Sequence, residues 1–179
     1  MSGICCRDEP GGETIKIDLK MLTRTAILLA LTVAFQSLAL PQPVTGPLVN
    51  AVLFVSTGIT GALSGVLIGG ITPWIAYAVG TMKLAPAVPV IMAGNISLVL
   101  AFALLFKRNR YVAAVVAAVV KWLVMTAGVK YLLLPAVKVP APVVTSLTIF
   151  QLWTALGGAV LALAVTAALK AWESRRLRV

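Results

Sequence analysis

The sequence predicts an all-α, polytopic membrane protein with six transmembrane helices and both termini in the cytoplasm. Of its 179 residues, 60 % are hydrophobic and 11 % are charged, and the mean hydropathy is +1.03. Soluble domains are roughly 45–50 % apolar and about 25 % charged. Long uncharged runs are separated by short basic or proline-rich segments, which is typical of helices that each cross a bilayer with about 20 residues. No separate soluble catalytic domain fits in the remaining length.

Three segments are expected along the chain: a polar cytoplasmic tail over residues 1–20, a transmembrane domain over 21–172 and a basic cytoplasmic tail over 173–179. The first tail contains Cys5 and Cys6. Adjacent cysteines do not form a framework disulfide and do not resemble a zinc site, so we interpret them as unpaired thiols in a reducing compartment. Their role is not defined by the sequence.

The first three spans lie in the uncharged stretch that begins after Arg24. We expect the first at Met21–Leu40, followed by an ordered loop at Pro41–Pro47, because each proline removes a hydrogen-bond donor and restricts the residue before it. The second and third share Pro47–Gly80, with a turn near Thr60–Ser64. At about 1.5 Å per residue this stretch barely crosses a core of about 30 Å twice. A re-entrant hairpin is the alternative.

The remaining three spans have clearer limits. Leu84–Phe106 is uncharged and is followed by a basic cluster, and Tyr111–Leu134 is followed by Pro135. A rigid connection through Pro140 and Pro142 leads to a sixth span from Thr145 to Trp172. The topology follows from the excess of Lys and Arg in cytoplasmic loops. Eleven of the fifteen lie on the side of the termini, against Lys83 and Lys138 on the other, and Lys121 and Lys130 lie within the fifth span.

The distribution of acidic residues excludes several function classes. There is no carboxylate from Leu19 to Trp172 and no histidine in the chain. Proton-coupled carriers with buried acids, intramembrane aspartyl or zinc proteases and Mg²⁺-dependent lipid transferases therefore lack their reactive groups. A phosphate-binding P-loop is also missing. We expect no enzymatic activity, no metal, no cofactor and no nucleic-acid partner, and any uphill transport must be powered by another polypeptide.

Uncharged polar side chains concentrate in the predicted outer half of the spans and near their middle. Such groups are costly in lipid and should face the bundle interior or a wet cavity. One interpretation is an outward-facing pocket for a small polar or aromatic molecule, and the other is interhelical hydrogen bonding with an interfacial aromatic belt. The candidate substrate-binding residues are Asn50, Trp74, Asn95, Lys121 and Gln151.

Lys121 is the most informative of these residues because it lies near the predicted bilayer centre with no carboxylate in any span to pair with it. Either it is a structural lysine bonded to amides or it contacts a ligand. Lys130 is nine residues further, on the opposite helix face, and should snorkel to the surface. Because the spans offer no buried carboxylate, a neutral or anionic substrate is favoured over a cationic one.

Small residues recur at a spacing of four in two places. Ala26, Ala30 and Ala34 form a smooth strip on the first helix, and Gly61, Gly65 and Gly69 do the same around the second turn. Both patterns allow close backbone approach. We expect the glycines to serve intramolecular packing, whereas the alanine strip alone does not decide between internal packing and an intermolecular contact.

Taken together, several short motifs resemble those of the substrate-binding S component of energy-coupling factor (ECF) transporters, over about Met21 to Trp172. They are the alanine strip and the runs Thr45-Gly46-Pro47-Leu48-Val49-Asn50, Thr72-Pro73-Trp74, Gly94-Asn95 and Gln151 through Gly157-Gly158. The resemblance implies a subunit in the prokaryotic plasma membrane that captures a vitamin-like molecule from outside.

The same resemblance implies docking through Ala26, Ala30 and Ala34 onto a transmembrane scaffold subunit that carries two ATPase subunits. No substrate-specific signature is present, and neither the oligomeric state nor sharing of the ATPase module is defined by the sequence. The alternative function is a small non-transport scaffold or assembly subunit of the membrane, whose polar residues only join its helices.

Overall fold

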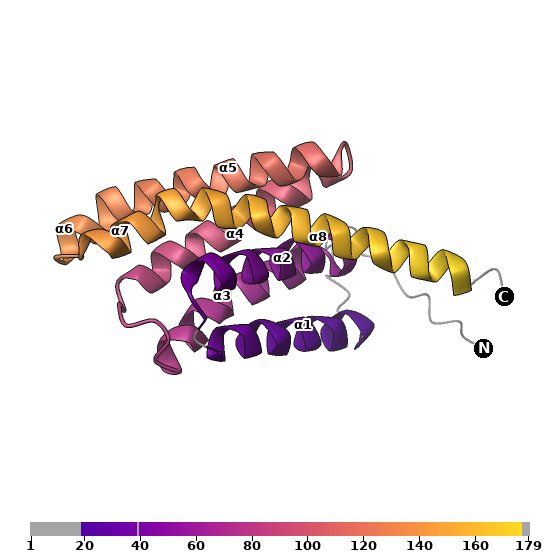
Figure 1. Ribbon diagram of the computed structural model, residues 1–179, viewed down its shortest axis with the longest axis horizontal. Coiled ribbons are helices and arrows are strands. Elements are labelled where there is room, and N and C mark those ends of the chain that lie inside the picture. The colour runs from indigo at the N-terminus through magenta and orange to yellow at the C-terminus, as the bar shows by residue number, and fades with distance from the viewer. Residues whose placement is uncertain (1–18, 39, 177–179) are drawn as a thin grey trace, which may run out of the picture.

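The computed structural model describes residues 19–38 and 40–176, and this part of the chain is helical with short connections and no strand (Figure 1). The predicted roles of Cys5, Cys6 and most of the N-terminal tail lie outside the described residues. The elements are α1 (Leu19–Ser37), α2 (Gln42–Thr60), α3 (Ala62–Ala78), α4 (Ala87–Phe106), α5 (Arg110–Gly128), the π-helical turn η1 (Val129–Leu133), α6 (Leu134–Ala136), α7 (Ala141–Leu147) and α8 (Ile149–Arg176).

The helices run roughly alongside one another as a bundle. The most extensive contacts join α4 to α5 and α2 to α8. Helix α1 lies at the margin, against α2 and α3, and buries only Thr25 and Thr32. Helix α1 begins and α8 ends at the same end of the bundle, beyond which α8 projects (Figure 1). We call this the terminal end, and the other the distal end.

Within the described residues, five helical segments are long and apolar enough to cross a membrane, among them the continuous segments Arg110–Ala136 and Ala141–Trp172. The all-helical, multi-span class predicted from the sequence is therefore confirmed. Helix α3 is apolar but has 17 residues, or about 26 Å at 1.5 Å per residue. A sixth crossing by this short helix stays a prediction, as does the side on which the termini lie.

The predicted loop at Pro41–Pro47 is wrong. Pro41 directly precedes α2, which begins at Gln42 and includes Pro43 and Pro47. The first N–H groups of a helix have no intrahelical acceptor, so Pro43 is tolerated in the first turn. Pro47 lies inside the helix, where it removes one backbone donor without ending the helix. The Thr45 hydroxyl also donates to the Leu40 carbonyl oxygen at 3.0 Å, which secures the entry to the helix.

Prolines near the start of a helix also explain why two other helix boundaries differ from those predicted from the sequence. Pro142 lies in the first turn of α7, so the last segment begins at Ala141 and not at Thr145. It is interrupted at Thr148 and continues to Arg176. The fifth segment continues through Pro135 to Ala136, because a π-helical turn precedes this proline.

Two predicted boundaries are confirmed. Helix α4 ends at Phe106. Helices α2 and α3 meet within Thr60–Ser64, at Gly61, whose φ of +105° is a conformation that favours glycine. Within the glycine series, only Gly65 and Gly69 serve packing. A Cβ on Gly65 would meet Thr57 and Val99, and one on Gly69 would meet Asn95 and Leu53, whereas Gly61 forms the turn.

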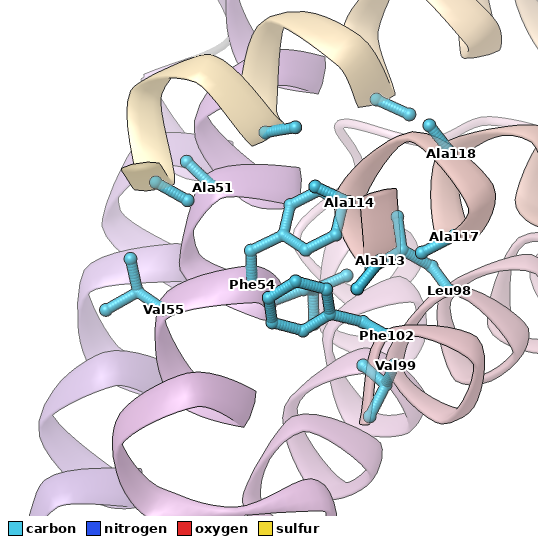
Figure 2. Close-up of a cluster of buried hydrophobic side chains, with 14 of the residues drawn as sticks. Ala51, Phe54, Val55, Leu98, Val99, Phe102, Ala113, Ala114, Ala117 and Ala118 are labelled. Atoms are coloured by element: carbon cyan, nitrogen blue, oxygen red, sulfur yellow. The ribbon is translucent and has the colours of Figure 1, made fainter. Parts of the chain in front are cut away.

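The main core combines two large rings with a wall of alanines (Figure 2). Phe54 of α2 and Phe102 of α4 pack edge to face with centroids 4.8 Å apart. Four fully buried alanines of α5 face them, namely Ala113, Ala114, Ala117 and Ala118. Lipid tails are as apolar as the side chains, so association between membrane helices depends on close packing, which small residues permit. The alanine face brings α5 against α4 and leaves space for the rings.

Glycines place the helices that carry polar side chains even closer together. A Cβ on Gly158 of α8 would lie 2.5 Å from Asn50 Cβ and 2.9 Å from the Ala51 nitrogen of α2. A Cβ on Gly94 of α4 would lie 2.5 Å from the Met125 sulfur of α5. These contacts fix α2, α4, α5 and α8 around the distal half of the bundle.

Candidate substrate-binding cavity

A cavity of about 620 Å³ opens in the distal half of the bundle, a size typical of small-molecule sites. Its lining comes from the end of α1, the start of α2, the end of α3, the start of α4, the middle of α5, and α7 with the start of α8. We call it the distal cavity. Its polar lining residues are Gln36, Gln42, Thr45, Asn50, Thr81, Lys83, Asn95, Lys121, Ser146 and Gln151.

Lys121 lies on the inner face of α5, one helical turn beyond Ala117 and Ala118, and is 3 % exposed. Its Nζ donates hydrogen bonds to Asn50 Oδ1 at 2.6 Å and to Asn95 Oδ1 at 2.8 Å. The lysine thus joins α5 to both α2 and α4. A carboxylate is not needed to satisfy these two donors, which explains how the side chain is accommodated without an acid in any span.

The Asn95 side chain accepts one hydrogen bond and donates another. Its Oδ1 accepts from Lys121, and its Nδ2 donates to the Gly69 carbonyl oxygen at 3.2 Å. Lysine has only donors, so the oxygen of each amide must face it. The close approach of Gly69 to Asn95 makes the second bond possible. Asn95 is therefore a positioning residue for the ammonium group, with its own orientation determined by α3.

Several polar groups at the cavity remain available to a ligand. An ammonium group has three N–H donors, and contacts within the described residues use two of them. The Asn50 amide nitrogen and the Gln151 side chain have no hydrogen-bond partner among the described residues, and buried Gln36 Oε1 has none either. Buried polar groups normally have partners, so the donors among these groups can bind a molecule that carries hydrogen-bond acceptors, whereas the Gln36 and Gln151 oxygens can only accept.

The remaining walls are apolar. Leu84 and Ile91 line the cavity beside α4, and Val143 and Leu147 line it from α7. They belong to a second hydrophobic cluster that also contains Met125 of α5. The distal cavity thus combines a polar floor of amides and one ammonium with walls suited to an aliphatic or ring-shaped part of a ligand.

Four of the five predicted substrate-binding residues meet in this cavity, namely Asn50, Asn95, Lys121 and Gln151. Trp74 is not among the lining residues. It is 54 % exposed on α3, and its neighbour Pro73 lines the cavity in its place. One residue along a helix turns the side chain by about 100°, which is sufficient to move the indole from the interior to the outer surface.

The sequence did not identify Lys83, Gln42 and Ser146 as lining residues. All three lie in or next to connections, where polar residues are ordinary and carry no signal of a site. The predicted docking residues Ala26, Ala30 and Ala34 all lie exposed on α1, so this face meets no other helix within the described chain.

Comparison with known families agrees with this architecture. Residues 20–170 match the model of the family described as "ECF transporter, substrate-specific component". The chain belongs to this family of ECF S components. It is therefore a multi-pass membrane protein of a transport system. The family's character as a substrate-binding subunit fits the cavity described above. No curated protein and no solved structure matched the chain.

Proposed function

We propose that this S component captures a small vitamin-like molecule from outside the prokaryotic plasma membrane in the distal cavity. It then docks on a separate scaffold and ATPase module that drives import, and it performs no catalytic step itself. The observation that carries this proposal is the Lys121–Asn50–Asn95 cluster at the base of a 620 Å³ cavity. Buried donors that remain open toward a cavity favour ligand binding over a purely structural role.

The chemistry of the cavity favours an anionic or neutral substrate with carbonyl or carboxylate oxygens. The lysine and the Asn50 amide nitrogen offer donors, and the described residues of the lining include no carboxylate that would attract a cation. Apolar walls around Leu84, Ile91 and Leu147 fit a ring or aliphatic portion.

The direct test is mass spectrometry of small molecules released by denaturing the detergent-purified protein, followed by rebinding of the released compound. A stoichiometric small molecule that rebinds with submicromolar affinity is the expected result. A small membrane scaffold whose polar residues only join helices would release nothing specific, and this outcome would favour that alternative function.

The orientation is tested by cysteine labelling in whole cells. With Cys5 and Cys6 replaced by serine, Lys83→Cys and Lys138→Cys, which are exposed at the distal end, should react with an impermeant maleimide. Arg108→Cys, exposed in the connection at the terminal end, should be protected until the membrane is permeabilised. The reverse pattern would place the termini outside. Labelling of all three would contradict a crossing by α4 and by α5.

Docking is proposed to occur on the alanine strip. Ala30→Trp places a large ring on the exposed face of α1, which would overpack an interface but not a lipid-facing surface. Co-purification with the scaffold and ATPase subunits should fall at least ten-fold while ligand binding persists. Leu31→Trp is the control, since this residue is also exposed on α1 but lies outside the strip. Equal effects of the two variants would remove the strip from the docking surface.

A further inference from the structure

A second cavity, of about 440 Å³, lies in the terminal half of the bundle and has no part in the function proposed above. We call it the terminal cavity. Its walls come from α2, α4, α5 and α8 and are mostly apolar, with lining residues that include Phe54, Phe102, Phe106, Ala114, Ala159 and Ala162. Most of these side chains are almost fully buried, so the cavity reaches into the bundle between the helices.

Three cations lie at this cavity, and each comes from a different helix. They are Arg24 of α1, Arg110 of α5 and Lys170 of α8, and the described residues of the lining include no carboxylate. Arg110 is held by its neighbour Tyr111, with the guanidinium 3.3 Å from the phenol oxygen and 5.1 Å from the ring centroid. A guanidinium has five N–H donors, so this contact leaves most of them available. The Arg24 and Lys170 side chains are exposed.

The arrangement differs from that of an ordinary basic helix end. Cations that are simply solvated at a helix end would not require an apolar cavity beside them. A cavity left by imperfect packing of the core would not require cations at its opening. Here an apolar cavity and three positive charges from different helices occur together. Basic pockets between membrane helices at a membrane surface match the headgroup and chain of an anionic lipid.

We propose that the terminal cavity binds one anionic phospholipid. One acyl chain occupies the apolar part of the cavity between α2, α4 and α8, and the phosphate lies among Arg24, Arg110 and Lys170. Charge complementarity selects an anionic headgroup over a zwitterionic one, since the described part of the lining places three cations at the cavity and no acid to pair with a choline or ethanolamine group. The apolar lining, which includes Gly58 and Ala162, suits a hydrocarbon chain.

The test is native mass spectrometry of the full-length protein in detergent, titrated with phosphatidylglycerol and with phosphatidylcholine of the same acyl chains. Phosphatidylglycerol should bind at least ten-fold more tightly. The double variant Arg110→Gln/Lys170→Gln should weaken its binding by roughly thirty-fold, from the loss of two charges near the phosphate. The control Lys107→Gln/Arg108→Gln removes two exposed charges beside the same end of the bundle, outside the lining. It should change affinity less than three-fold.

Two further experiments distinguish binding of the lipid headgroup from binding of the acyl chain. Gly58→Leu fills part of the cavity, and a Cβ there meets Phe106 only at an ordinary 3.6 Å, so folding should persist. Phosphatidylglycerol binding should fall at least five-fold, and glycerol phosphate without chains should not compete at equal concentration.

Equal weakening by the two double variants, no preference for the anionic lipid, or full competition by glycerol phosphate would each overturn the proposal. The proposal would also be overturned if neither Gly58→Leu nor Arg110→Gln/Lys170→Gln changed the affinity for phosphatidylglycerol. If the latter pair instead abolished only co-purification of a protein partner, the cations would serve protein docking.

Discussion

The two ends of the bundle use their polar groups in opposite ways. In the distal cavity the polar side chains are buried on three helices and bond to one another, with Lys121 between Asn50 and Asn95. In the terminal cavity the interior is apolar and the cations stand at the margin. The difference shows that a charge deep within such a bundle needs amide partners supplied by neighbouring helices, whereas a charge at a helix end can reach water or headgroups by itself.

Backbone spacing explains how the two ends differ. Around the distal cavity, Gly69, Gly94 and Gly158 bring helices into contact so that short amide side chains can meet across the interfaces. Toward the terminal end, alanines of α5 and α8 face Phe54 and Phe102, which fill the space between the helices. The glycine contacts around the distal cavity thus bring amide side chains within reach of their partners, and the alanine faces toward the terminal end pack against the rings.

The largest expected effect concerns the charge at the base of the distal cavity. Lys121→Met keeps the aliphatic length and removes the donor, which should cost about 1.5–3 kcal/mol of binding, or a ten- to hundred-fold loss of affinity for the co-purified compound. Lys130→Met is the control on the same helical segment, because that lysine is exposed beside Tyr131. Isothermal titration of both variants measures the difference. Unchanged affinity in Lys121→Met would make this lysine purely structural.

An intermediate effect is expected from the glycine contact between α2 and α8. Gly158→Ala places a Cβ 2.5 Å from Asn50 Cβ and 2.9 Å from backbone atoms of α2, so the helices must separate at a cost of about 1–3 kcal/mol. Gly157→Ala should be tolerated, since its Cβ would lie 3.5 Å from Pro47. Thermal unfolding in detergent should show a lower midpoint for Gly158→Ala alone. Similar midpoints for the two variants would contradict the close approach.

The smallest effect is expected at Gln151, whose amide has no partner among the described residues. Gln151→Leu should weaken ligand binding by about two- to ten-fold, as expected for one neutral hydrogen bond of about 0.5–1.5 kcal/mol. Thr154→Val, one turn further along α8, removes a hydroxyl that bonds only to the Gln151 carbonyl oxygen and is absent from the cavity lining. It should leave affinity unchanged, and weakening by both variants would indicate a general disturbance of α8.

Much of the fold followed from the sequence because long apolar runs in a membrane protein have few alternatives to helices. The end of α4 at Phe106 and the turn at Gly61 were predictable from charge and glycine. The prolines were misleading at Pro41–Pro47 and at Pro142, because Pro43 and Pro142 occupy the first turn of a helix and Pro47 lies inside α2 without ending it.

For the site, the sequence alone determined that Lys121 has no acid to pair with and that polar side chains gather in one half of the spans. Only the tertiary structure decided that Asn50 and Asn95 are its partners, that Pro73 and not Trp74 lines the cavity, and that Lys83 reaches it from a connection. The physical reason is geometric. Depth along a helix can be counted from the sequence, but the direction in which a side chain points depends on which neighbours pack against that helix, and here close glycine contacts between helices determine it.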